Sequence, residues 1–173
     1  NVWGITYSED EIDGSPYLND EFEEGSVYTT SKVQYTGLPL RYNIFNDEME
    51  FRAKGNMVFA IAEPEKIERI EFGGTKMVFL RYTRRGEIKQ GYFVVMEEGK
   101  ASLYRKPTTI FPDAKEPAAY KEAEPAKFDR KPDEYYIGLG SDNIMHIRTR
   151  KDLTNVFPDH HKELKSFIKK NRV

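Results

Sequence analysis

The stretch KIERIEFGGTKMVFLRY, residues 66–82, decides the fold, because two strand-like runs flank a two-residue glycine loop. Gly73-Gly74 can adopt the positive φ angles that a tight hairpin turn requires. Pairing outward from this loop places Ile70 opposite Met77 on one face and a glutamate opposite a lysine on the other. Because turn chemistry and strand register agree, the stretch predicts an antiparallel β-hairpin.

The same alternation of apolar and polar residues extends to both sides of this hairpin. Trp3, Ile5 and Tyr7 alternate near the N-terminus and suggest a short first strand. Further strands joined by turn residues are predicted within residues 27–35, 38–61, 91–105 and 135–148.

Two of the expected strands are apolar on both faces. Met77 and Phe79 alternate with Val78 and Leu80, and residues 92–96 show the same pattern. A strand that is apolar on both sides must be covered on both sides. The sheet is therefore expected either to fold onto itself or to be capped by a helix.

These patterns predict a mainly β fold built as a curved or doubled antiparallel sheet of hairpins. We expect about eight to ten strands, a usual size for a sheet, arranged as a half-open barrel or a sandwich with two short C-terminal helices. One domain is expected for residues 1–173. Its segments are an acidic N-terminal segment (1–25), a hairpin sheet (26–111), a crossover rich in Pro, Ala, Lys and Glu (112–134), a hairpin (135–148) and a helical end (149–173).

The crossover is expected to be extended, because its four prolines disfavour both a long helix and a ladder strand. Tyr120 and Phe128 are its expected anchors. A mobile linker between two domains is the alternative, although the part that follows is short for an independent domain.

The helical end begins with Thr149 and Asp152, which resemble a capping box. An apolar stripe at helical spacing follows among lysines. Replacing Phe167 by Ala is expected to cost about 3–5 kcal/mol if its ring is fully buried. The positions expected to cover one face of the sheet are Leu153, Val156, Leu164, Phe167 and Ile168.

Composition excludes several functional classes. The 173 residues contain no cysteine, which excludes disulfides, thiolate nucleophiles and cysteine-ligated metal centres. No run approaches the ~20 apolar residues of a membrane-spanning helix. The first residue is Asn1, so we expect a processed or trimmed chain, with a removed export signal as one explanation.

Charge is unevenly distributed around a net value of −2. The first 31 residues carry acids and no Lys or Arg, whereas residues 148–172 are rich in both cations. We interpret these as two solvated surfaces that attract each other weakly. A nucleic-acid-binding tail is the alternative, but the domain is mildly acidic and lacks a recognised motif.

Motifs for metals, cofactors or catalysis are weak, and we expect no catalytic, cofactor-binding or metal-binding residues. Acids from Glu9 to Asp20 partly match a calcium loop, but two ligand positions carry Glu and the last carries a short Asp. His160 and Glu163 are three residues apart on the expected helix and suggest a surface pair. Neither a nucleophile elbow nor a phosphate-binding glycine loop occurs.

Several short segments of the chain carry a family resemblance: GSPYLN (14–19), GSVY (25–28), LRYNI (40–44), PEKI (64–67), GYF (91–93), KDL (151–153) and FPD (157–159). Together they resemble a family of small exported proteins of Bacteroidetes-type bacteria to which no activity is assigned. The resemblance covers most of the chain from Gly14 onward and implies a secretion signal, a periplasmic or cell-surface location, and in many members a further helical stretch beyond Lys169. It implies no reaction.

Two functions remain as hypotheses. The first is a non-catalytic exported protein that binds an envelope protein or polysaccharide, without nucleic acid or a membrane span. The alternative is a glycan-directed hydrolase that uses paired carboxylates, one of them with a raised pKa. For the binding function we expect a half-exposed tyrosine surface, because tyrosine offers a flat ring with a polar tip. Its members would be Tyr82, Tyr92, Tyr104, Tyr135 and Tyr136.

Overall fold

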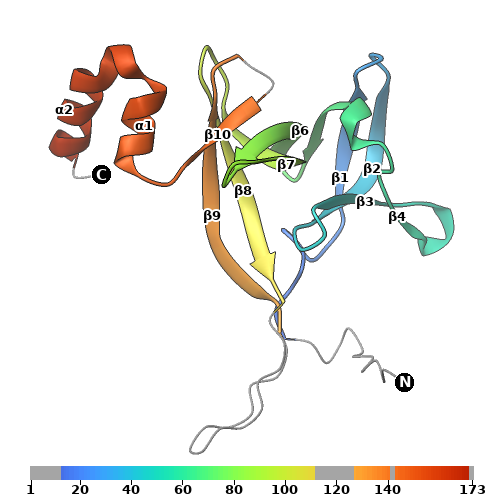
Figure 1. The fold of residues 1–173 in the computed structure, drawn as a ribbon. Coiled ribbons are helices and arrows are strands. Elements are labelled where there is room, and N and C mark those ends of the chain that lie inside the picture. The colour runs from blue at the N-terminus through green and yellow to red at the C-terminus, as the bar shows by residue number, and fades with distance from the viewer. Residues whose placement is uncertain (1–12, 112–126, 141–142, 172–173) are drawn as a thin grey trace, which may run out of the picture.

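The computed structural model describes residues 13–111, 127–140 and 143–171 and confirms the mainly β fold (Figure 1). All strands of the described residues belong to one sheet, in the order β10-β9-β8-β7-β6-β5-β1-β2-β3-β4. The strands are β1 (Glu23–Thr29), β2 (Gln34–Asn43), β3 (Glu48–Arg52), β4 (Val58–Ala60), β5 (Ile67–Phe72), β6 (Thr75–Arg84), β7 (Glu87–Glu97), β8 (Ser102–Ile110), β9 (Asp129–Gly138) and β10 (Asn143–Ile147).

The sheet has two halves, a barrel and a curved sheet, and strand β6 belongs to both. Its first residues pair with β5, and residues 81–83 pair with β10 in parallel. The pairings from β6 through β7, β8, β9 and β10 back to β6 therefore close a five-stranded barrel. A meander with an odd number of strands brings its first and last strands together in parallel, which explains this exception to the antiparallel pattern. Strands β5, β1, β2, β3 and β4 continue as a curved sheet beside the barrel.

The hairpin predicted from residues 66–82 is confirmed in turn and register. Ile70 pairs with Met77, and Glu71 pairs with Lys76. Gly73 and Gly74 both have positive φ angles, 53° and 71°, which L side chains rarely adopt.

Two separate cores explain why β6 and β7 are apolar on both faces. Met77 and Phe79 face the first core, between the curved sheet and the outside of the barrel. Val78 and Leu80 face the second core, inside the barrel around Phe93. The expectation that the sheet folds onto itself is therefore confirmed.

The C-terminal helices do not cover a face of the sheet, contrary to the expectation. Helix α1 (Arg150–Val156) contacts β10, while α2 (His161–Asn171) contacts mainly α1 and the 3-10 turn η4 (Pro158–His160). Figure 1 shows both helices beside the barrel. The physical reason is that the two halves of the sheet already cover each other. The side chains of Phe167 and Ile168 lie outside the described residues.

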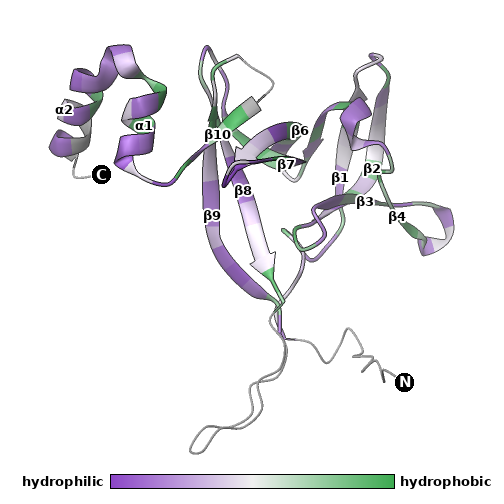
Figure 2. Cartoon of the chain, in the orientation of Figure 1, coloured by the Kyte–Doolittle hydropathy of each residue, from purple (hydrophilic) through white to green (hydrophobic). Residues whose placement is uncertain are grey.

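Helix α1 begins as predicted. The Asp152 backbone N–H donates to Thr149 Oγ1, and the Thr149 backbone N–H donates to the Asp152 carboxylate, which completes a capping box. Figure 2 shows that hydrophilic residues dominate both helices. Within the described ranges, neither helix has the length and apolar character needed to cross a membrane.

The predicted crossover is shorter than expected, because β9 already begins at Asp129. Pro132 lies inside this strand. It is tolerated because the register between β8 and β9 shifts between Lys106 and Thr108, and such a bulge leaves a residue outside the ladder. Phe128 packs against Phe111 at a centroid distance of 4.7 Å, whereas Tyr120 and the first expected strand lie outside the described residues.

Candidate functional site: a cationic cleft beside the barrel

The five tyrosines do not form the expected exposed surface. Tyr82, Tyr92 and Tyr136 are buried, so the expectation of half-exposure is wrong for these three. Tyr104 is half-buried against the barrel core, and Tyr135 is 44% exposed. Closure of the barrel covers the faces that sequence alternation alone left open.

The barrel interior nevertheless brings two of these tyrosines together. The rings of Tyr82 and Tyr136 meet edge to face at 5.5 Å, and each also contacts Phe93. Tyr92 lies apart from them in the first core, where its ring contacts Tyr42 and Phe79. Tyr82, Tyr92 and Tyr136 are therefore packing residues rather than parts of a shared surface.

Residues that sequence patterns did not bring together form a cleft of about 420 Å³. The turn between β6 and β7, strands β9 and β10, and the residue after β10 contribute to it. We call it the cationic cleft, and its lining residues are Thr83, Arg84, Arg85, Gly86, Glu134, Met145, His146 and Arg148.

Strand geometry explains why these side chains meet. Glu134 lies two residues before Tyr136 on β9, so both point to the same face. His146 is directly opposite Tyr136 on β10, and its ring stacks on the tyrosine at 4.7 Å with an interplanar angle of 19°. The turn at Arg85 and Gly86 has φ angles of 53° and 83°, which reverses the chain tightly at the edge of the cleft.

Glu134 is the anionic centre of the cleft, and fixed donors occupy both of its carboxylate oxygens. The Arg84 guanidinium donates to Oε1, and the Tyr136 hydroxyl donates to Oε2 at 2.9 Å. The His146 imidazole lies further away, with Nε2 at 3.9 Å from Oε2. Glu134 and Arg84 therefore neutralise each other's charge, and their contacts hold both side chains in place at the cleft.

Burial lowers the pKa of His146, and the nearby Arg148 and Arg84 charges lower it further. Glu134 and Asp152 act in the opposite direction but more weakly than burial. Since the ordinary value is 6.5, the imidazole is neutral at pH 7 and can either donate or accept a hydrogen bond.

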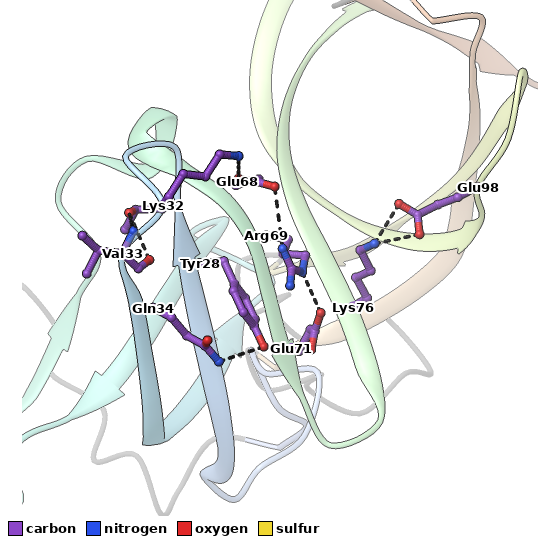
Figure 3. Close-up of polar contacts among 10 residues, drawn as sticks. Tyr28, Lys32, Val33, Gln34, Glu68, Arg69, Glu71, Lys76 and Glu98 are labelled. Atoms are coloured by element: carbon purple, nitrogen blue, oxygen red, sulfur yellow. Dashed lines mark hydrogen bonds and ion pairs between the residues drawn. The ribbon is translucent and has the colours of Figure 1, made fainter.

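Two cations of the cleft have no partner among the residues that the structure describes. Neither the Arg85 nor the Arg148 guanidinium forms a hydrogen bond or ion pair with any residue that the structure describes. Cations on the outer face of β5 and β6 differ from these two, because each of them forms an ion pair with a glutamate (Figure 3). Those pairs are Lys32–Glu68, Arg69–Glu71 and Lys76–Glu98.

A second polar cluster lies partly buried between the two halves of the sheet. Asp47 accepts hydrogen bonds from the Tyr42 hydroxyl at 2.6 Å, the Tyr92 backbone N–H at 3.1 Å and the Lys106 ammonium at 2.8 Å. The ammonium also donates to the Tyr92 carbonyl oxygen, and burial lowers its pKa. Because its donors and acceptors satisfy each other, we interpret this cluster as a structural link.

Two other hollows fit a ligand less well. One, of about 550 Å³, lies at the Gly73-Gly74 turn, and its Glu71 and Lys76 already have ion-pair partners. A smaller hollow of about 290 Å³ in the curved sheet, between Val27 and Phe51, is apolar.

The structure adds no metal ligands to the histidine and acidic motifs within the described residues. Within the described ranges, no group of three or more metal-ligating side chains occurs. His160 Nδ1 and Glu163 Oε2 are 2.8 Å apart on an exposed helix surface, which confirms the predicted pair. Residues 9–12 of the possible calcium loop lie outside the described residues.

Comparisons with protein-family models, with curated proteins and with solved structures give no match. The geometry of the cationic cleft is therefore the basis for a functional proposal.

Proposed function

We propose that this chain is a non-catalytic binding protein whose cationic cleft accepts an oxyanion group of its ligand. The observation that carries the proposal is a pair of guanidinium groups on a cleft of about 420 Å³. These groups, of Arg85 and Arg148, have no partner within the described part of the chain. Guanidinium groups present planar forks of donors that match carboxylate, sulfate and phosphate oxygens. The resemblance to exported proteins supports the periplasm or the cell surface as the place of action.

The alternative hydrolase receives less support from the site. Hydrolysis by paired carboxylates needs an acid and a base or nucleophile on the two sides of one bond. Among the residues lining the cleft, Glu134 is the only carboxylate, and its oxygens are occupied. The described carboxyl groups with a displaced pKa are Glu68, Asp129 and Asp152, and in all three it is lowered.

Calorimetric titration with sulfate, inorganic phosphate and galacturonate tests the proposal. We expect at least one of these probes to bind, and Arg85→Ala and Arg148→Ala each to weaken that binding roughly tenfold, the effect of losing a charge-assisted hydrogen bond. Arg130→Ala is the matched control, because Arg130 pairs with Asp133 outside the cleft.

Unchanged affinity in both cleft variants would overturn the proposal. Equal weakening by Arg130→Ala would do so as well, because it would show that only the net charge matters. Absence of binding by all three probes would have the same meaning.

A further inference from the structure

The cationic surface does not end at the cleft. Between α1 and α2 lies a second hollow of about 540 Å³, and four of its lining residues are lysine or arginine. We call it the helical hollow. Its lining residues are Arg150, Lys151, Thr154, Asn155, His161, Lys165 and Lys169.

The two hollows are adjacent along the chain. Arg148 lines the cationic cleft, and Arg150 lines the helical hollow only two residues later. Two residues span at most about 7 Å of backbone. Helix α1 also contacts β10, which carries His146 of the cleft. Cations of the two hollows therefore lie close together, as contact of one extended ligand with both hollows requires.

The cations of the helical end are available to such a ligand. Residues 148–171 contain seven Lys or Arg residues and three Asp or Glu residues. Two of the acids are engaged, since Asp152 caps α1 and Glu163 contacts His160. The cations without an ion pair to any described residue are Arg148, Arg150, Lys151, Lys162, Lys165, Lys169 and Lys170.

The chemistry of the lining favours a soluble, charge-rich polymer. Nucleic-acid strands are bound by basic grooves that also offer aromatic rings for base stacking. A membrane surface is bound by basic residues together with large apolar side chains that enter the lipid. Among the lining residues that the structure describes, neither hollow has Phe, Tyr or Trp, and those of the helical hollow are all charged or polar.

We propose that the ligand is an acidic polysaccharide, with one acidic group in the cationic cleft and further acidic groups along the helical hollow. This inference rests on the proposed function of the cleft and names its ligand class. Binding at several charges makes affinity increase with chain length, because each further contact is intramolecular once the first is made. It also makes affinity fall more steeply with salt than for a monomer.

The test compares galacturonate with oligogalacturonates of increasing length. We expect the longer chains to bind the intact protein at least tenfold more tightly than the monomer. Lys165→Ala/Lys169→Ala should remove most of this gain and leave monomer affinity unchanged. Because alanine favours helix, this variant should keep α2, which circular dichroism verifies. Lys54→Ala/Lys100→Ala, at exposed positions elsewhere, is the matched control.

The outcomes separate this inference from the proposed function. Monomer binding without a gain for longer chains overturns the polysaccharide and leaves the oxyanion cleft standing. Loss of the gain in the Lys54/Lys100 control shows a nonspecific charge effect and also overturns it. Tighter binding of a single-stranded oligonucleotide, or of phosphatidylglycerol vesicles, than of the oligogalacturonates would replace the polysaccharide by that class of partner. Failure of the monomer and the other small oxyanions to bind contradicts the cleft itself.

Discussion

The Lys106 ammonium lies 2.8 Å from Asp47 Oδ2, and this contact joins barrel strand β8 to the turn between β2 and β3 of the curved sheet. Lys106 also lies over the ring of Phe93 at 4.8 Å, inside the barrel. Asp47 holds a φ angle of 58°, a conformation that Asp tolerates better than most residues. One ion pair thus connects the two cores.

Replacing Lys106 by Met should destabilise the protein by about 3–5 kcal/mol, because it leaves the Asp47 carboxylate partly buried without its cation. Urea unfolding measures the free energy. The double variant Asp47→Asn/Lys106→Met should be less destabilised than the single variant, because neither partner is then charged. A loss below about 0.5 kcal/mol, as at ordinary surface positions, would show that the contact is not a structural link.

A side chain at Gly91 should displace the Asp47–Lys106 ion pair. A Cβ atom there would lie 2.3 Å from Asp47 Oδ2 and 2.7 Å from Lys106 Nζ, so Gly91→Ala should cost about 1–3 kcal/mol through overpacking. Gly99→Ala is the control, since its Cβ would meet only the Ala101 oxygen at 3.6 Å. Equal thermal unfolding midpoints for the two variants would contradict the geometry.

The buried tyrosines should make the protein sensitive to alkali. Burial raises the pKa of Tyr42, Tyr92 and Tyr136, with further contributions from Asp47 for the first two and Glu134 for the third. A raised folded-state pKa contributes stability that is fully present below the unfolded value near 10 and is lost as pH rises above it. When the pH is raised, the absorbance of ionised tyrosine from these three residues should therefore appear only as the protein unfolds. Complete titration near pH 10 in a still-folded protein would contradict their burial.

Oxyanion binding in the cationic cleft should strengthen as pH falls below 6.5. The pKa of His146 is lowered by burial, so the imidazole gains its charge only below the ordinary value and then attracts the anion. Sulfate is a suitable probe, because it does not titrate in this range, and His146→Gln should flatten the profile. Equal pH dependence in that variant would assign the effect to another group. The charged groups around His146 are Glu134, Arg84, Arg148 and Asp152.

Thr149→Ala should destabilise the helical end by about 1 kcal/mol, the usual cost of losing an N-cap. Because α2 contacts mainly α1 and η4, the change should speed hydrogen exchange in both helices. Exchange of core amides in β6 and β7 should stay unchanged. Thr154, whose hydroxyl bonds only within α1, provides a control as Thr154→Ser. Faster exchange throughout the barrel would show that the helices support the sheet after all.

Patterns of neighbouring residues predicted the hairpins. The position of the cationic cleft depends instead on pairing between strands that are far apart in the sequence. The Gly73-Gly74 turn and its register follow from adjacent residues, and so does the cap at Thr149. The cationic cleft depends instead on β10 lying parallel to β6, for example Ile144 beside Tyr82. Nothing local in either strand specifies that partner. The same missing contact made Tyr82 and Tyr136 look half-exposed, because each strand by itself shows only alternation.

Parallel closure by β10 also sets an order of events during synthesis. When β6 has been made, the backbone groups at residues 81–83 have no partner on the side that β10 later occupies. At typical ribosomal rates of about 5–20 residues per second, the roughly 60 residues up to β10 take about 3–12 s. Throughout that interval the nascent chain presents an open strand edge, which other chains can join. A ribosome-stalled chain that ends before Asn143 keeps this edge open and should therefore aggregate more readily than the full-length chain.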